Sequence, residues 1–388
     1  MFKVLTLNNI SVAGLEHLPR ERYEVASEIQ HPDAILLRSY NMHDMAIAET
    51  LKAVGRAGAG VNNVPVDALS RRGIPVFNAP GANANAVKEL VVAGMLLASR
   101  NICQAWAYVS DLDSADDASL HSAVEAGKKT FAGFELAGRT LGVVGLGAIG
   151  IKVANTALSL GMQVVGYDPA ITVRNAWQMS SQVRHTASVD DLFAQSDFIT
   201  FHVPLVDATR NMLSAERVAM LKAGAVVLNF ARSGVVDDQA LGAALEAGRV
   251  RAYVCDFPSA QLRANPRVIA LPHLGASTKE AEDNCAVMVA EQIRDFLENG
   301  NIVNAVNFPE AVMPRTEGSR LAIANANVPN MVGQISTAVA QAGLNIIDLL
   351  NKSRGELAYT LVDIEGGVPD DLVERIRKID GVLSVRAV

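Results

Sequence analysis

One stretch, Arg139–Asp168, constrains the fold of this 388-residue chain more than any other. It consists of an apolar run, a glycine-rich turn, a helical pattern and a second apolar run that ends in Asp168. This order predicts a strand, a turn, a helix and a strand that bind a dinucleotide, because a helix N-terminus offers free N–H groups to the pyrophosphate. Gly145 permits the tight turn, Gly147 a close approach of the phosphates, and Gly150 close packing of the helix on the strand.

The acid at the end of the second run indicates which dinucleotide binds. Asp168 lies about 18 residues beyond Gly150, where a carboxylate suits a ribose 2′-hydroxyl and repels a 2′-phosphate. We therefore expect NAD rather than NADP, with Ala148 and Ile149 among the cofactor-binding residues. A glycine turn alone also occurs for packing, but the flanking strand, helix and acid together favour a dinucleotide.

Strands and helices alternate along the rest of the first 300 residues. This alternation predicts parallel sheets in an α/β fold, one of them a doubly wound nucleotide-binding domain. The expected strands are Phe2–Leu7, Ala34–Leu37, Thr50–Gly55, Ile74–Phe77, Thr140–Val144, Val164–Tyr167, Asp197–Val203, Ala225–Ala231, Ala252–Cys255 and Val268–Leu271. Long helices are predicted over Asn85–Arg100 and Thr278–Asn299.

The last 70 residues differ in pattern and follow a predicted linker, Phe308–Gly318. Three strand-like runs and two helical runs precede a final strand-like run in the order βαββαβ, which predicts a ferredoxin-like module. The segments are Leu321–Ala326, Met331–Ala342, Ile346–Asn351, Ala358–Ile364, Pro369–Lys378 and Val382–Ala387. The module contains no acid–base pair or nucleophile constellation, so binding or regulation is expected rather than catalysis.

Composition excludes several partners and compartments. A net charge of −7 and the lack of a basic run argue against nucleic acid, and no apolar run is long enough for a membrane span. The three separated cysteines form no metal motif and suit reduced thiols, so we expect a soluble, cytoplasmic protein without a metal. The polar segment 110–127 shows no clear periodicity, and the preceding Trp106 and Tyr108 suit either a subunit contact or a core.

Two side chains that directly follow predicted strands are catalytic candidates. Arg232 could grip a substrate carboxylate by two parallel hydrogen bonds, although a surface arginine is an equal alternative from residue type alone. His273 could serve as the base that alcohol oxidation requires. His202 competes with His273, but its apolar setting suits a structural or cofactor-lining role.

Several segments now carry a resemblance to a known family. The matching segments are 37–40, 54–64, 78–90, 145–150, 229–237 and 271–288. On these the chain resembles the D-isomer-specific 2-hydroxyacid dehydrogenases, and among them the 3-phosphoglycerate dehydrogenases that end in an ACT domain. The resemblance implies a Rossmann nucleotide-binding domain, 96–277, inserted in a flavodoxin-like substrate domain, 1–95 and 278–312, with an ACT regulatory domain at 318–388.

The resemblance also implies an activity and a set of site residues. The expected reaction oxidises 3-phospho-D-glycerate to 3-phosphohydroxypyruvate with NAD, the entry to serine biosynthesis, in a homodimer or homotetramer. Arg232 would hold the carboxylate and His273 would be the acid–base. The other implied substrate residues are Arg38, Ser39, Arg56, Ala59, Gly60 and Asn83, and the other implied cofactor residues are Pro204, Thr209, Ala231, Asp256 and Gly275.

Two departures from the family pattern bear on function. Gln261 stands where the family has a glutamate beside the histidine; a glutamine can orient an imidazole but supplies no negative charge. In the C-terminal module, Asn330 stands at the turn where an ACT domain usually has Pro-Gly, and asparagine adopts the left-handed conformation less readily than glycine. The implied serine contacts are Asn325, Asn327 and Asn345.

Three functions remain open at this stage. The first is an NAD-dependent phosphoglycerate dehydrogenase under feedback control. The second is a dehydrogenase for another 2-hydroxy or 2-oxo acid, such as hydroxypyruvate or 2-oxoglutarate. The third is a non-catalytic NAD-sensing protein, which the presence of Gln261 keeps open. The C-terminal module is likewise either a serine-binding domain or a purely structural dimerisation domain.

Overall fold

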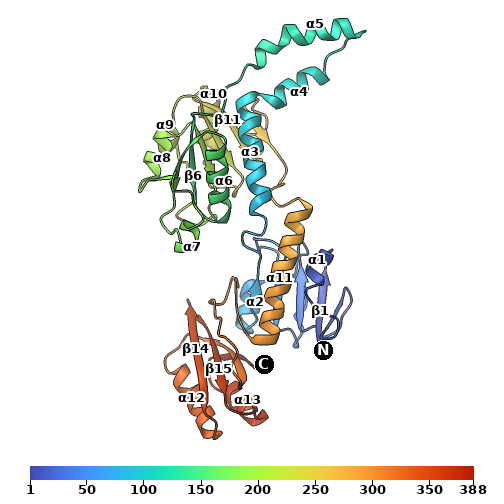
Figure 1. Cartoon of the computed structure of the whole chain (residues 1–388), viewed down its shortest axis with the longest axis vertical. Coiled ribbons are helices and arrows are strands. Elements are labelled where there is room, and N and C mark those ends of the chain that lie inside the picture. The colour runs from blue at the N-terminus through green and yellow to red at the C-terminus, as the bar shows by residue number, and fades with distance from the viewer. The chain divides into compact units, whose positions relative to one another are not determined.

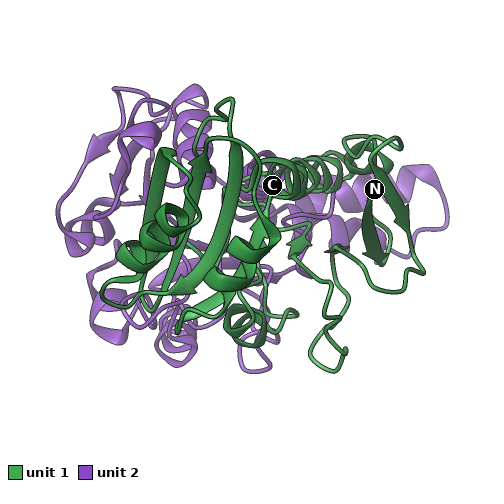
Figure 2. Cartoon of the chain, turned by 90° about the horizontal axis from the view of Figure 1, so that it is seen from below, with its two compact units in different colours: residues 1–83, 279–388 green, residues 84–278 purple.

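The computed structural model describes residues 1–388, which form two compact units (Figure 2). The first unit comprises residues 1–83 and 279–388, and the second comprises residues 84–278. The second unit begins with helix α3 (Ala84–Arg100), so the sequence-based boundary at residue 95 lies inside this helix.

The second unit carries the labels α3 to α10, β6 and β11 in Figure 1. It contains a sheet of seven parallel strands in the order β12-β11-β10-β9-β6-β7-β8. The strands are β6 (Thr140–Val144), β7 (Gln163–Tyr167), β8 (Arg184–His185), β9 (Phe198–Phe201), β10 (Ala225–Asn229), β11 (Val250–Cys255) and β12 (Val268–Ala270). The strand order reverses at β6, which has β7 on one side and β9 on the other. Ligands of such sheets bind beyond the carboxyl ends of the strands at this switch point.

Several helices of this unit begin at polar capping residues. Ser188, Ser214 and Asp237 each accept a hydrogen bond from a backbone N–H in the first turn of the helix that follows. Besides α3, the helices are α4 (Ile102–Ser110), α5 (Asp117–Gly127), the 3₁₀ turn η1 (Lys128–Phe131), α6 (Ala148–Ser159), α7 (Val173–Ala176), α8 (Val189–Gln195), α9 (Ala215–Met220) and α10 (Asp238–Glu246).

The first unit contains a sheet of five parallel strands in the order β2-β1-β3-β4-β5. Its elements are β1 (Phe2–Leu7), α1 (Val12–Leu15), β2 (Tyr23–Ala26), β3 (Ala34–Leu37), β4 (Ala53–Arg56), α2 (Val66–Arg71), β5 (Val76–Phe77) and α11 (Lys279–Asn299). This is the flavodoxin-like order that the resemblance implied. Helix α11 buries Val289 and Ile293 in the core of this part, so the chain after the second unit rejoins the N-terminal sheet.

The C-terminal module also belongs to the first unit and has the expected βαββαβ order. Its elements are β13 (Ser319–Ala326), α12 (Met331–Gln341), β14 (Ile346–Arg354), β15 (Leu357–Ile364), α13 (Asp370–Arg377) and β16 (Val382–Ala387), in an antiparallel sheet of order β14-β15-β13-β16. Alternation along β13 divides the two faces: Leu321 and Ile323 pack with the two helices, whereas Ala322 and Ala324 join the core of the N-terminal sheet.

Two stretches differ from the sequence-based expectation. The segment 110–127, to which we assigned no periodicity, contains helix α5, because Asp116 and Ser119 form a reciprocal capping box at its start. The expected linker is packed rather than loose, with Phe308, Ala311 and Met313 buried and Ile302 paired with Ala311 in a β-bridge. No single helix is long and apolar enough to span a membrane; only the bent pair α3 and α4 meets the length and composition together.

Candidate functional site

The glycine-rich turn between β6 and α6 has the geometry of a phosphate cradle. Gly145 has a φ of +92°, and a Cβ on it would lie 2.5 Å from the His202 carbonyl oxygen. A Cβ on Gly150 would lie 1.9 Å from the Gly145 carbonyl oxygen, so only glycine fits there. A Cβ on Gly147 would meet nothing within 4 Å, and no side chain caps the helix that starts at Ala148. Space and free N–H groups therefore coincide at this helix N-terminus.

Asp168 is held against the same turn. Its Oδ2 accepts a hydrogen bond from the Leu146 N–H at 2.8 Å, and its Oδ1 accepts one from the Ala170 N–H at 2.9 Å. Each carboxylate oxygen retains a further lone pair for a ligand hydroxyl. The turn thus fixes a carboxylate where the expected ribose would need it.

A buried asparagine organises the turn that carries Arg232. Asn229, at the end of β10, is 1% exposed; its Oδ1 accepts from the Ala231 N–H at 3.1 Å, and its Nδ2 donates to the Arg232 carbonyl at 2.9 Å. Arg232 is exposed and its Nη1 donates to the Ala231 carbonyl at 2.6 Å, with no carboxylate partner. Asn229 lies in the matching segment 229–237, but sequence analysis assigned it no role. Its role depends on the geometry of the turn, which only the structure shows.

Asp256 is the most unusual group beside these residues. It is 1% exposed, and no hydrogen bond of good geometry reaches either carboxylate oxygen, although the backbone N–H groups of Asp256 itself and Gly275 lie close enough to lower its pKa. Burial raises the pKa of Asp256, while the charges of His273 and Arg232 act in the opposite direction. A Cβ on Gly275 would lie 3.6 Å from Asp256 Oδ2. A buried carboxylate with no well-placed donor is expected to bind a ligand, and the N–H group of a ligand amide would supply the hydrogen bond.

His273 is exposed, and its ring lies 4.6 Å from the ring of Phe257, centroid to centroid. The structure does not bring Gln261 into a hydrogen bond with it; the Gln261 side chain is exposed and unbonded. His202 differs, since its Nε2 lies 3.0 Å from Thr200 Oγ1 and burial lowers the pKa of His202 to about 3. That neutral ring suits the structural role expected for it.

Two expected cofactor-cleft residues are joined in the loop after β9. The Thr209 Oγ1 donates to the Pro204 carbonyl at 2.5 Å and accepts from the Val206 N–H at 2.9 Å. Thr209 is buried, so its hydroxyl shapes the loop from within.

In the first unit, the expected phosphate-binding residues gather after β3 and β4. A cavity of about 440 Å³ is lined by Asn8, Asn9, Arg38, Ser39 and Glu282. Arg38 Nη1 forms an ion pair with Glu282 Oε1 at 2.6 Å, and Arg56 Nε donates to the Arg38 carbonyl at 3.0 Å. Sequence reasoning missed Asn8, Asn9 and Glu282, because their segments lie far from β3 along the chain.

The remaining expected substrate residues follow the neighbouring strands. Gly58 lies beside Arg56, because a Cβ on it would fall 1.8 Å from Arg56 Nη1. Asn78 Nδ2 donates to the Ala59 carbonyl at 2.6 Å, which fixes the loop that also holds Gly60. Asn83 lies in the turn before α3.

The asparagines of the C-terminal module are only partly assembled within one chain. Asn325 and Asn327 line a cavity of about 150 Å³ beside the turn before α12, where Asn330 has a φ of +65°. Asparagine therefore does adopt the left-handed conformation here. Asn345 does not line this cavity; its Nδ2 donates to Glu365 Oε2 at 3.0 Å.

Comparisons with known proteins agree with this geometry. Residues 92–275 match the model of the D-isomer specific 2-hydroxyacid dehydrogenase, NAD binding domain. D-3-phosphoglycerate dehydrogenase of Methanocaldococcus jannaschii is 37% identical over 88% of this chain and 63% of its own length. The enzyme of the same name from Haemophilus influenzae is 34% identical over 87% of this chain and 82% of its own length. The chain thus spans under two thirds of the archaeal relative.

A solved structure shares the fold. The NAD⁺-bound 3-phosphoglycerate dehydrogenase of Entamoeba histolytica superposes with a TM-score of 0.61 at 24% identity, over 79% of this chain and 98% of its own.

Proposed function

This chain belongs to the D-isomer-specific 2-hydroxyacid dehydrogenase family, and on that premise we propose that it oxidises 3-phospho-D-glycerate to 3-phosphohydroxypyruvate with NAD. The observation that carries the proposal is the identity of 33–37% to curated relatives named D-3-phosphoglycerate dehydrogenase, over most of the chain. This reaction is the first step of L-serine synthesis. NAD is the cofactor, as the family match of residues 92–275 indicates.

The residues present fit NAD. The open space at Gly147 suits the pyrophosphate, and the Asp168 carboxylate suits the ribose hydroxyls. The unbonded Asp256 carboxylate is an acceptor for the carboxamide N–H of the nicotinamide. When bound, NAD accepts the hydride that leaves C2 of the substrate.

The chain's own residues bind the substrate and take its proton. The exposed Arg232 guanidinium, free of any carboxylate, holds the substrate carboxylate by two parallel hydrogen bonds. His273 takes the proton of the C2 hydroxyl and becomes positively charged. The Asp256 carboxyl, which interacts electrostatically with His273, offers the negative charge near the imidazole that Gln261 lacks.

The phosphate selects the substrate. Arg38 and Arg56 line the region after β3 and β4, and their guanidinium groups suit a phosphate dianion. The Arg38–Glu282 ion pair fits this assignment, because the carboxylate holds the arginine in place until a doubly charged phosphate competes for it. An unphosphorylated 2-hydroxy acid would leave the Arg38–Glu282 pair intact and would gain little binding energy from Arg38.

Formation of NADH tests the proposal. Purified full-length protein is assayed with NAD and 3-phosphoglycerate, D-glycerate, D-lactate or 2-hydroxyglutarate, alongside Arg232→Gln and His273→Asn. We expect turnover of 3-phosphoglycerate, a fall in kcat/KM of about 10- to 100-fold for Arg232→Gln from the lost carboxylate bonds, and near abolition for His273→Asn. If an unphosphorylated acid is oxidised instead, the substrate is another 2-hydroxy acid and not 3-phosphoglycerate. NAD binding without turnover of any acid would indicate a sensor.

The C-terminal module has a proposed regulatory role. Its βαββαβ order is that of an ACT domain, and the cavity lined by Asn325 and Asn327 offers amide groups to an amino acid such as L-serine. Asn345 would complete that site from a second copy placed side by side. The enzyme would then be a homo-oligomer, and the free thiols of its three cysteines suit the reducing cytoplasm.

A further inference from the structure

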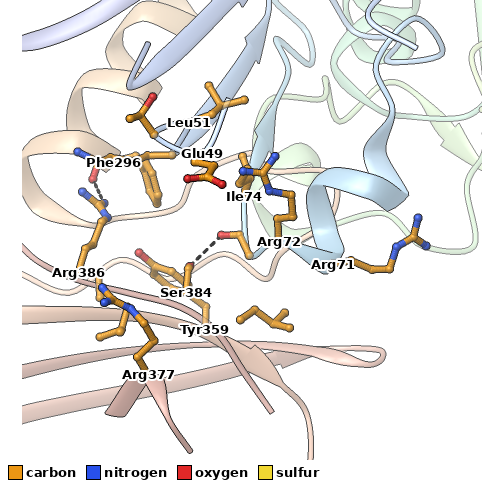
Figure 3. A pocket seen from close by; sticks show the side chains of 16 residues that line it. Glu49, Leu51, Arg71, Arg72, Ile74, Phe296, Tyr359, Arg377, Ser384 and Arg386 are labelled. Carbon is orange, nitrogen blue, oxygen red and sulfur yellow. Dashed lines mark hydrogen bonds between the residues drawn. The ribbon is translucent and has the colours of Figure 1, made fainter. Parts of the chain in front are cut away.

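A third cavity, separate from every site described above, lies within the first unit between the C-terminal module and the N-terminal sheet (Figure 3). Its volume is about 540 Å³. One wall comes from residues 49–52 and 71–74, the other from Arg377 on α13 and residues 383–386 on β16. We propose that this cavity binds a small organic polyanion, a phosphorylated or polycarboxylic metabolite, which joins the module to the substrate-binding part of the chain.

Three guanidinium groups line the cavity without a carboxylate partner. Arg386 donates to the carbonyls of Phe296 and Leu297 and lies 4.1 Å over the Phe296 ring. Arg72 donates to the carbonyls of Ile47 at 2.8 Å and Ala48 at 2.9 Å. Arg71 is exposed and makes no hydrogen bond or ion pair. Figure 3 shows the Arg71 and Arg72 side chains on the wall opposite Arg377 and Arg386.

The other charged groups around the cavity do not neutralise these three guanidinium groups. Lys52 is paired with Asp33 at 2.7 Å, and Arg377 is paired with Glu374. Glu49 is the only acidic residue among those that line the cavity. The cavity lining therefore carries a net positive charge, which lowers the electrostatic energy of a bound anion.

A purely structural role explains only part of this arrangement. Arg386 caps the C-terminal turn of α11, where a cation is favourable, and Arg72 fixes the loop before β4. Neither function requires Arg71, nor the open space between the two walls. Apolar side chains also line that space, among them Leu51, Ile74 and Leu383, and they suit the carbon skeleton of an organic ligand.

Because the cavity lies at the contact between the C-terminal module and the N-terminal part, a bound anion would stabilise that contact. The module contacts the N-terminal part here through a hydrogen bond from Ser384 Oγ to the Gly73 carbonyl at 3.1 Å. An anion bridging Arg71 on one wall and Arg386 on the other adds charge-assisted hydrogen bonds across this contact. Binding therefore stabilises the docked module, and we expect slower amide exchange in β16.

Calorimetric titration of the full-length protein tests the proposal. Citrate and pyrophosphate are the probes, at constant ionic strength, and sodium chloride is the reference. We expect saturable binding of one or both anions, weakened about tenfold or more by Arg71→Gln, because one charge-assisted interaction is lost. Arg71 makes no intramolecular bond, so this variant should fold normally. Arg20→Gln, an equally exposed arginine of the same unit without a partner, should bind as the unmodified chain does.

A second variant distinguishes anion binding in this cavity from anion binding at the proposed substrate site. Arg38→Gln should leave the Arg71-dependent binding unchanged, and hydrogen exchange should show protection of β16 that Arg71→Gln removes. Equal affinity in the unmodified chain and Arg71→Gln, or no binding of either probe at millimolar concentration, would overturn the proposal. Because binding is measured without turnover, this result does not depend on the dehydrogenase activity.

Discussion

At the scale of single residues, the candidate active site is organised around a buried charge. Neither oxygen of Asp256 has a hydrogen bond of good geometry, and the Arg232 guanidinium lies near enough for its charge to act on the carboxyl. Such a carboxylate costs stability, because burial favours its neutral form. Proteins retain groups of this kind where a ligand or a reaction uses them.

Replacing Asp256 by asparagine should therefore stabilise the fold while impairing catalysis. The pKa of Asp256 is raised in the folded state, so stability falls as pH rises above the unfolded value near 3.8 and through the folded value. At neutral pH we expect Asp256→Asn to raise the free energy of unfolding by roughly 1 kcal/mol and to lower kcat/KM. Urea denaturation at pH 5 and pH 8 checks this, with the exposed Asp113→Asn as control. A less stable Asp256→Asn variant would contradict the account.

At the scale of elements, the β6–α6 turn separates structural from functional glycines. Gly150 faces the Gly145 carbonyl so closely that a methyl group cannot fit, whereas Gly147 faces open space. The same motif thus serves helix packing at one position and ligand access at another.

Two alanine substitutions should distinguish these roles. Gly147→Ala should leave the melting temperature nearly unchanged but raise the Kd for NAD, because its Cβ enters the space assigned to the pyrophosphate. Gly150→Ala should lower the melting temperature, because overpacking typically costs about 1–3 kcal/mol of folding free energy. Gly367→Ala, with a free surrounding and an ordinary backbone conformation, is the control for both measurements. Equal NAD affinity of Gly147→Ala and the unmodified chain would refute the cradle.

A buried ion pair lies within the C-terminal module, between β13 and β15, and its arginine also binds the preceding segment. Arg320 and Asp363 are both fully buried, with Nε–Oδ1 at 2.6 Å and Nη2–Oδ2 at 2.8 Å. Arg320 also donates to the carbonyls of Asn299, Met313 and Pro314. Burial acts to raise the pKa of Asp363, but the bonds from Arg320 and Thr316 lower it below the ordinary value.

Breaking this pair should unfold or detach the module. Asp363→Asn should cost about 3–5 kcal/mol, because it leaves the Arg320 charge buried and unpaired. The contribution of Asp363 is present above its unfolded pKa near 3.8 and is lost as pH falls through the lower folded value. Thermal unfolding measures the loss, with the exposed Asp371→Asn as control. A change below 1 kcal/mol would show that the pair does not hold the module.

At the scale of the whole molecule, we propose the arm formed by α4 and α5 as a contact between subunits. Neither helix buries a residue, and Trp106 is 72% exposed, with Ile102 and Val109 exposed beside it on α4. Tyr108, by contrast, donates to the Ala123 carbonyl at 2.8 Å and fixes α4 to α5. Apolar residues on an unsupported arm are typical of a subunit contact.

Trp106→Asp should therefore shift the protein toward a smaller assembly. The change places a charge in the expected contact, and sedimentation velocity would report the lower mass. Trp177→Asp, at an equally exposed tryptophan outside the arm, should leave the assembly intact. An unchanged mass for Trp106→Asp would exclude the arm as the contact.

Sequence alone predicts both parallel sheets, the C-terminal module and the NAD site, because glycine spacing and apolar runs are local signals. It does not predict β2 or α5, whose short or polar sequences lack a clear period. Nor does it find Glu282 beside Arg38, the unbonded state of Asp256, or the cavity around Arg71. Each of these depends on segments that meet only after the chain has folded.

The central claim is that Arg38 and Arg56 select a phosphorylated 2-hydroxy acid. The most direct measurement is the ratio of kcat/KM for 3-phosphoglycerate to that for D-glycerate, in the unmodified chain and in Arg38→Gln and Arg56→Gln. We predict a ratio well above 100 that falls about tenfold or more in each variant, because only the phosphorylated substrate loses a charge-assisted bond. A ratio near one, or a ratio that neither variant changes, would contradict the account.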